Sequence, residues 1–317
     1  MPLTSPNDVK TLMGWNQVVY IDYNSEGYKP LRVTEFMLGT NQAGDAADYV
    51  TGRQDRTAWT KGPIEVQGNI TYPLTFESGV VFSGDKMFRL GAQLAEDIQI
   101  NFGMESTIGE RIAGCKVQTA SISCNAKEPV QCSATVWGIT EQTNLSSGGA
   151  TEEPEIFKYT DTTYGDTSSG QDVRGLLQIV QVPMWDMVMV EGAPEGMLVI
   201  GFKVEIDNQL QRNYTMGNET MASPWGLNAT SITAGQRKIT GTLTWQSDSD
   251  GHLSFIMGTG IGKLTIKIGD VMTMTMNNVL WNANPPRLAT GDRVTVESSF
   301  TALGTGADDF DALVFTV

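Results

Sequence analysis

Two stretches of the sequence decide the fold: KGPIEVQGNITY (61–72) and AGQRKITGTLTW (234–245). They align without a gap. The shared glycines, threonines and apolar residues recur at one offset, in the pairs Gly62 and Gly235, Gly68 and Gly241, Thr71 and Thr244, Val66 and Ile239, Ile70 and Leu243, Tyr72 and Trp245. Apolar and polar residues alternate in each copy, which predicts a β-strand with one buried face. A repeat of this kind indicates a duplicated domain.

The stretches on both sides of this strand also occur twice. Upstream, GWNQVVYIDYNSEGY (14–28) resembles MWDMVMVEGAPEGM (184–197), and LRVTEFML (31–38) resembles VIGFKVEI (199–206). Downstream, each half ends in a predicted hairpin, at 115–138 and at 272–302. We therefore predict a mainly β protein with two tandem domains of the β-sandwich or barrel type. The first spans 1–138 with an N-terminal arm, and the second spans 182–317. An acidic connector rich in Ser, Thr and Gly spans 139–181.

Each domain is expected to add about one helix and one long loop. In the first half Ser83 is the expected N-cap, and Met87, Leu90, Leu94 and Ile98 follow at helical spacing. The second half has a shorter version at 252–260. Irregular segments are predicted at 39–60 and 217–234, and the last residues, 313–317, are expected to add one more strand. Loops of this length usually have a function or are ordered by a partner.

Composition limits the possible functions. A chain of 317 residues is long enough for two cores. Its formal net charge of -15 argues against a protein that grips nucleic acid, because that affinity comes from clustered Lys and Arg. The sequence has no secretory signal pattern at its start and no run of 18 apolar residues, so we expect no membrane insertion.

We find no constellation that would support catalysis, a cofactor or a metal. The chain has one histidine, His252, so a His-pair metal site or an ordinary catalytic triad has little to build on. The run 258–265 has the wrong spacing for a phosphate loop, and QSDSDGHL (246–253) is an incomplete calcium loop. Cys124 and Cys132 lie symmetrically about Glu128 and are expected to be reduced thiols. We therefore expect a protein that is not an enzyme.

These patterns together resemble a known family. A Trp-x-x-Val entry to the first strand, a long loop, G-x-x-x-[VI]-x-G-x-[IL]-T-[YW], one helix and a final hairpin resemble the tail tube proteins of long-tailed bacteriophages. The pieces FKVEIDNQL (202–210), RKITGTLTW (237–245) and GCKVQTASISCNAKEPVQCSATVWGI (114–139) carry the resemblance. It covers most of the chain outside the connector and rests on strand patterns, with no catalytic motif involved.

The resemblance implies a structural virion protein that polymerises as stacked rings around a DNA channel. One chain with two tube domains would form a pseudo-hexameric ring as a homotrimer. The long loops would lock successive rings together, which makes Arg53, Arg56, Trp59 and Trp225 candidate ring-stacking residues. The polar face of the repeated strand would line the lumen, with Glu65, Gln67, Asn69, Lys238, Thr240 and Thr242 as candidates. In half one and half two these linings would differ.

The expected partners follow from the same resemblance. They are other copies of the chain, tail terminator and baseplate proteins, and a sheath if the tail is contractile. Double-stranded DNA would pass without specific binding. The protein would be located in the virion tail after assembly in the host cytoplasm. Two alternatives stay open at this point: a baseplate hub or tail-tip component with the same fold, and a non-phage β-sandwich protein for binding or adhesion.

Overall fold

The computed structural model describes most of both halves of the chain. The described residues are 17–24, 29–47, 58–76, 82–96, 98–104, 108–142, 182–192, 197–215, 228–247, 261–270, 272–282, 295–306 and 311–316. No helix within these ranges is long and apolar enough to cross a membrane.

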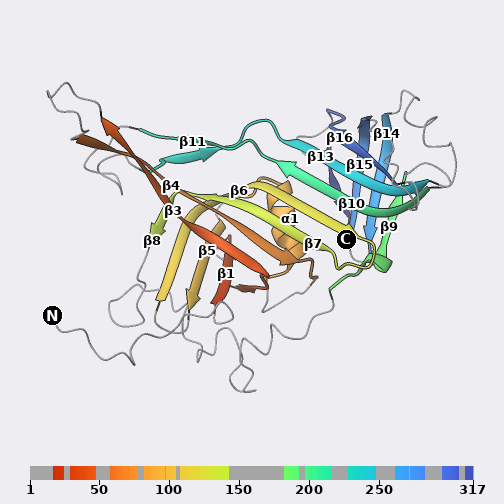
Figure 1. The fold of residues 1–317 in the computed structure, drawn as a ribbon, viewed down its shortest axis with the longest axis horizontal. Coiled ribbons are helices and arrows are strands. Elements are labelled where there is room, and N and C mark those ends of the chain that lie inside the picture. The colour runs from red at the N-terminus through yellow and green to blue at the C-terminus, as the bar shows by residue number, and fades with distance from the viewer. Residues whose placement is uncertain are drawn as a thin grey trace, which may run out of the picture.

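The first half consists of strands around one described helix, α1 (Gly84–Ala92) (Figure 1). Its strands are β1 (Gln17–Tyr23), β2 (Lys29–Leu31), β3 (Glu35–Ala47), β4 (Ala58–Pro73), β5 (Ile98–Met104), β6 (Ile108–Asn125), β7 (Gln131–Gly138) and β8 (Thr140–Gln142). The repeated stretch 61–72 lies inside β4, as predicted.

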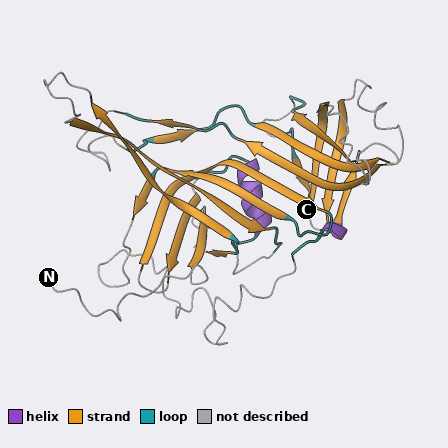
Figure 2. Ribbon diagram, in the orientation of Figure 1, coloured by secondary structure: helices purple, strands orange, loops and turns teal. Residues whose placement is uncertain are grey.

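The second half begins with a short 3₁₀ turn at Trp185–Met187. Its strands are β9 (Val188–Glu191), β10 (Met197–Asp207), β11 (Gln211–Asn213), β12 (Ser231–Thr233), β13 (Lys238–Ser247), β14 (Ile261–Ile268), β15 (Met272–Asn282), β16 (Thr295–Leu303) and β17 (Val314–Thr316). The second repeat ends in β13, and β17 is the strand expected at the C-terminus. The prediction of a mainly β fold is confirmed (Figure 2).

The strands of the two halves are ordered in the same way. The pairing order is β1-β5-β6-β7-β4-β3 in the first half and β9-β14-β15-β16-β13-β10 in the second. The register also agrees: Tyr72 pairs with Cys132 in the first half, and its repeat partner Trp245 pairs with Val296 in the second. The sequence repeat therefore corresponds to a repeat in strand order and register.

One sheet of 15 strands contains both halves, because β6 pairs with β10. This junction runs from Thr119 opposite Asp207 to Asn125 opposite Gly201. β11 and β12 form a separate two-stranded sheet. The described strands thus join the two halves directly, through main-chain hydrogen bonds of the ordinary antiparallel type.

The prediction of an irregular segment at 39–60 is wrong for most of these residues. β3 and β4 stay paired out to Ala47 opposite Ala58, as a long hairpin arm that extends away from the helix (Figure 1). The sequence of this arm, GTNQAGDAA (39–47), lacks alternating apolar residues, because the two strands hold each other through their backbones and need no buried face for that pairing. The residues 48–57 lie outside the described ranges.

One further expectation needs a smaller correction. The segment 217–234 was expected to be irregular, but it contains β12, which pairs with β11. At the start of the expected connector, 139–181, β8 pairs with β6 and extends the sheet to Gln142. Both strands are only three residues long, too short for a periodic pattern to reveal. The rest of the connector up to residue 181 lies outside the described ranges.

The helix α1 is shorter than its sequence pattern predicts. Leu94 has a left-handed φ of 54° and ends it, and Ile98 begins β5. Ser83 precedes the helix as expected, but its side chain makes no capping bond. Thr75 takes that role: the amide of Gly84 donates to Thr75 Oγ1 over 2.8 Å. The counterpart segment, 252–260, lies outside the described ranges.

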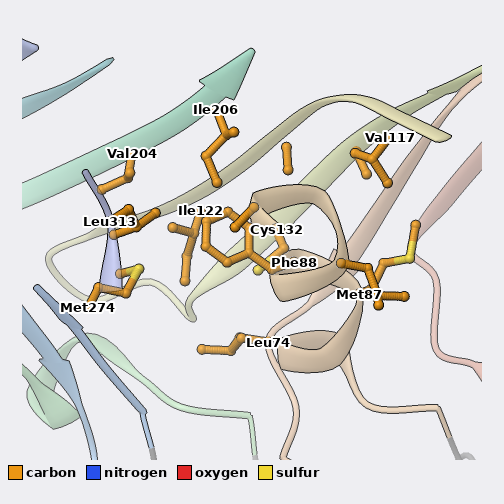
Figure 3. Close-up of a cluster of buried hydrophobic side chains, with 14 of the residues drawn as sticks. Leu74, Met87, Phe88, Val117, Ile122, Cys132, Val204, Ile206, Met274 and Leu313 are labelled. Atoms are coloured by element: carbon orange, nitrogen blue, oxygen red, sulfur yellow. The ribbon is translucent and has the colours of Figure 1, made fainter. Parts of the chain in front are cut away.

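The helix packs in the middle of one hydrophobic core that both halves share. Figure 3 shows Met87 and Phe88 of α1 among side chains of both halves, including Ile206 of β10 and Leu313 next to β17. Phe88 also meets Phe315 edge-to-face, with ring centroids 5.9 Å apart. The first half therefore completes its core with residues of the second. Cys115, Cys124 and Cys132 are all buried in this core as free thiols.

Candidate functional site

Eight strands form a continuous ribbon that carries the candidate site. Their order is β3-β4-β7-β6-β10-β13-β16-β15, and we call them the eight-strand ribbon. One face of the ribbon covers the core. On β13, Ile239, Leu243 and Trp245 are at most 1% exposed, and Val66, Ile70 and Tyr72 of β4 are equally buried. The alternation read from the repeat is therefore real in both copies.

The other face of the ribbon is polar across both halves. Residues that pair from strand to strand form rows in which most side chains carry a hydroxyl, amide or carboxylate group. One row, in strand order, is Glu35, Thr71, Ser133, Ser121, Glu205, Thr240 and Thr301. A second row is Met37, Asn69, Thr135, Thr119, Asp207 and Lys238. Hydrogen bonds link neighbours within these rows: Thr135 donates to Asn69 over 2.8 Å, and Ser121 bonds Ser133 over 2.8 Å.

The six residues expected in a channel lining lie on this polar face. Gln67, Asn69 and Lys238 are exposed, and Glu65, Thr240 and Thr242 are partly exposed. Glu65, Gln67 and Asn69 belong to β4 and the other three to β13, so three strands, β7, β6 and β10, separate the two groups in the ribbon. The structure thus places all six residues on one surface, in two groups that belong to different strands.

The candidate ring-stacking residues are mostly outside the described ranges. Arg53, Arg56 and Trp225 lie there. Trp59 belongs to β4, opposite Ala46 in the hairpin arm, and its side chain is also outside the description. The ring-stacking role of these four residues stays a prediction.

The charge on the polar face is mixed and slightly acidic. On β3, β4, β10, β13 and β16 its carboxylates are Glu35, Glu65, Glu205, Asp207 and Glu297, and its amines are Lys203 and Lys238. Lys203 is paired with Glu205 at 2.8 Å. A surface of hydroxyls and amides with few unpaired cations has little means of holding a phosphate backbone, whose binding depends on Lys and Arg.

Arg212 of β11 connects the second half of the chain to β4 and β7 of the first. Its guanidinium donates to the main-chain oxygen of Val66 over 2.9 Å and lies 4.0 Å from the ring centroid of Trp137. Glu65 approaches the guanidinium at 3.6 Å. Sequence reasoning missed this cluster, because Arg212 and its partners come from three separate strands, β11, β4 and β7, and share no local pattern.

A second polar cluster joins the halves beneath the ribbon. Asn208 is fully buried, and its amide donates to the main-chain oxygens of Gly91 and Val117, each over 2.8 Å. Gln118 accepts from the amide of Leu210 over 2.8 Å and donates to Asp207 over 3.0 Å. Gln118 occupies an irregularity of β6, between Val117 and Thr119. The part that Asn208 takes in this junction was not predicted from the sequence.

An apolar groove lies at one end of the ribbon. It has a volume of about 590 Å³ and lies between the β6–β7 turn and the beginnings of β9 and β10. Its lining includes Trp185, Met189 and Leu198, which are 46%, 57% and 57% exposed. Exposed apolar residues gathered in one place usually mark an interaction site. This groove was also not predicted, because the residues read as ordinary strand positions.

The buried thiols are held in their neutral form. Burial raises the pKa of Cys115 and of Cys132 well above the usual value, and burial together with Glu128 raises the pKa of Cys124 to about 11. A thiol reacts as its thiolate, so these cysteines are poor nucleophiles in the folded chain.

Comparison with known proteins gives a family. A family model described as "Phage tail tube protein" matches residues 6–304, which is nearly the whole chain. A search of the curated proteins gave no match.

Proposed function

The chain belongs to the phage tail tube protein family, whose members are structural components of the phage tail, and from this we propose that it polymerises as stacked rings that form the DNA channel of the tail. Each ring would be a homotrimer in which every chain contributes two tube units. The likeness of the two halves in strand order and register supports this count. The unit boundaries proposed are 1–138 and 182–317, with the connector between them.

The observation that carries the proposal is the eight-strand ribbon. It spans both halves, buries one face in the core and leaves the other face polar, with Arg212 of β11 packed on Trp137 and Glu65 at one end. A channel wall needs such a surface, one that is hydrated, continuous and unable to bind phosphates. Electrostatic repulsion acts over only about 8 Å at physiological salt, so an acidic lining would prevent adhesion of DNA and would not drive its movement. The lining would include Glu65, Gln67, Asn69, Lys238, Thr240 and Thr242.

The two ends of the ribbon differ from each other, and this difference supports the stacking of rings. The apolar groove lies beside Asn125 and Gly201, at the end of β4 that carries Pro73. The long segments that contain Arg53, Arg56 and Trp225 leave from the opposite end, after Ala47 of β3 and beyond β11. A surface at one end that fits a different surface at the other is a head-to-tail interface, which generates an open tube. We propose that the groove receives those segments of the next ring.

The partners and location follow from this function. The chain would assemble in the host cytoplasm and remain in the virion tail, in contact with terminator and baseplate proteins, and with a sheath in a contractile tail. DNA would pass through without specific binding. The chemistry that the buried thiols and the single histidine offer gives no support for an enzyme.

Negative-stain microscopy of the purified protein at high concentration tests the proposal. We expect rings and tubes with a continuous central channel. Only monomers, over a range of salt and temperature, would contradict it. The number of copies in a virion then separates a tube, which needs many trimers, from a hub at the tail tip, which needs one or two.

A further inference from the structure

The connection after β16 is longer than its counterpart in the first half. In the first half only Ile139 separates β7 from β8, and β8 pairs with β6. In the second half residues 304–313 separate β16 from β17, and β17 pairs with β15. Since β15 is the counterpart of β6 in the strand order, β17 takes the place of β8. The second half therefore carries an insertion at this point, and the strand that follows the insertion reaches α1 of the first half.

We propose that residues 311–316 hold α1 of the first half in place, and we call them the strap. A chain then enters a ring only when the strap is bound to α1. The contact between the strap and α1 belongs to the single chain, whereas its effect on assembly rests on the proposed function. The described residues support the strap with an apolar contact, a charge near the end of the helix, and a turn that orients this charge.

The apolar side chains of the strap pack on α1. Phe315 meets Phe88 edge-to-face, with ring centroids 5.9 Å apart. Leu313 is 3% exposed and lies in the same core as Phe88 and Met274 of β15 (Figure 3). Met274 is also the residue of β15 that pairs with Phe315. The strap thus joins the sheet of the second half to the helix of the first.

A charged contact secures the end of α1. Arg237 comes from the second half, and its guanidinium donates to the main-chain oxygen of Ala92, the last residue of the helix. An oxygen at this position has no partner within the helix, and the helix dipole favours a cation beside it. Burial lowers the pKa of Arg237, and the carboxylate of Asp311 in the strap raises it. Asp311 therefore favours the charged guanidinium that binds the helix.

A turn at the start of the insertion orients Asp311. The Asp311 carboxylate accepts a hydrogen bond from the amide of Thr305 over 2.8 Å and another from the Thr305 hydroxyl. Gly304 leaves room for this approach, since a Cβ atom there would lie 2.5 Å from a carboxylate oxygen of Asp311. Gly306 has a φ of 80°, in the left-handed region that favours glycine. The turn thus holds the carboxylate where it acts on Arg237.

The position of the helix explains why the strap would control assembly. α1 packs against β6 and β7 of the eight-strand ribbon, and β6 forms the junction with β10. Without the strap, Phe88 loses its apolar cover and Arg237 loses the Asp311 charge, so α1 should open more often. The ribbon would then lack a fixed support at its junction. A chain that ended at Leu303 would have all eight strands of the ribbon and still not enter a ring.

Amide exchange on the soluble single chain tests the strap. Phe315→Ala removes the ring that meets Phe88, and Val314→Ala is the matched control, because Val314 lies in the same strand and is 40% exposed. In the Phe315 variant the amides of α1 should exchange about tenfold faster than in the wild type, while those of β13 keep their protection. The control should exchange like the wild type. Unchanged exchange in α1, or the same increase in α1 and β13, would overturn the strap.

Ring formation by the same variants tests the effect on assembly. Phe315→Ala should give fewer rings than the wild type at equal protein concentration, and Val314→Ala should give as many. A normal yield of rings from Phe315→Ala, despite faster exchange in α1, would overturn the control of assembly. If the wild type forms no rings, the proposed function fails, and the exchange result still decides the strap. If Phe315→Ala does not fold, Phe315→Leu replaces it in both experiments, since leucine keeps apolar volume and removes the ring pair.

Discussion

Asn208 and Gly91 are joined by a hydrogen bond that connects the two halves, from the side-chain amide of Asn208 to the main-chain oxygen of Gly91 over 2.8 Å. Gly91 lies in the last turn of α1, where helix carbonyls lack partners within the helix. Asn208 also donates to Val117. A residue at the end of one half's strand therefore stabilises the helix of the other.

The first prediction concerns this residue. Asn208→Ala should lower the free energy of unfolding by about 2 kcal/mol, because it removes two buried hydrogen bonds and leaves their acceptors without these partners. Urea unfolding of the single chain measures this. The control, Gln211→Ala, changes an exposed residue a short distance along the chain and should have little effect. Equal stabilities of the two variants would contradict the role of Asn208.

The second prediction concerns Arg212. Arg212→Ala should cost about 3 kcal/mol, because the guanidinium combines a main-chain bond with a stack on Trp137 in a buried position. Arg212→Lys keeps the charge but loses the planar stack, so it should recover only a small part of that loss. A lysine variant as stable as the wild type would mean that charge alone matters. Tube yield should fall in the same order, since ring closure needs the two halves at a fixed angle.

The third prediction concerns the glycine of the repeat. A Cβ atom at Gly241 would lie 2.4 Å from the main-chain oxygen of Lys203 and 2.3 Å from the ring of Phe300. Gly241→Ala should therefore destabilise the protein by about 2 kcal/mol through overpacking. Gly39→Ala is the matched control, because its Cβ would meet nothing within 4 Å. Thermal unfolding of both variants gives the comparison. If Gly241→Ala is as stable as the wild type, the prediction is contradicted, because the strands beside Gly241 can then move apart to admit the methyl group.

The fourth prediction concerns pH and the thiols. Burial raises the pKa values of Cys115, Cys132 and Tyr72 in the folded chain, so folding favours their neutral forms. The stability from this source is complete below the usual thiol pKa of 9.0 and decreases as the pH rises above it. Unfolding free energy should be level near neutral pH and fall above about pH 9. Cys115→Ala combined with Cys132→Ala should make that fall smaller; an unchanged fall would contradict the assignment.

A thiol titration completes that test. Native protein near neutral pH should react very slowly with a thiol reagent, and unfolded, unreduced protein should show all three thiols. A lower count after unfolding would mean that Cys124 and Cys132 form a disulfide in solution.

The fifth prediction concerns the apolar groove. Leu198→Glu should leave the single chain stable, because this side chain is already 57% exposed, but it should prevent stacking. Size-exclusion chromatography should then show trimers that do not elongate. Replacement of 48–57 by a short glycine-rich turn should give the same result. The control Val314→Glu makes the same chemical change at an exposed position of β17, outside the groove. Normal tubes from the Leu198 variant would contradict a stacking role for the groove.

The sequence predicted most of the fold because the repeated strand has a buried face in each half. Val66, Ile70 and Tyr72 and their repeat partners alternate with polar residues, and that pattern specified both the strand and its exposed side. The hairpin arm of β3 and β4 was missed, since its backbone pairing leaves no trace in side-chain type. The clusters of Arg212 and Asn208 were also missed, because their partners meet only after the two halves have joined.

The most direct measurement is a reconstruction of the assembled tube by electron cryomicroscopy. The account predicts threefold rings, a continuous wall of paired strands, and Gln67, Asn69, Thr240 and Thr242 facing the central channel. Tubes in which this polar face lies on the outer wall, with the core residues of α1 toward the channel, would contradict the account.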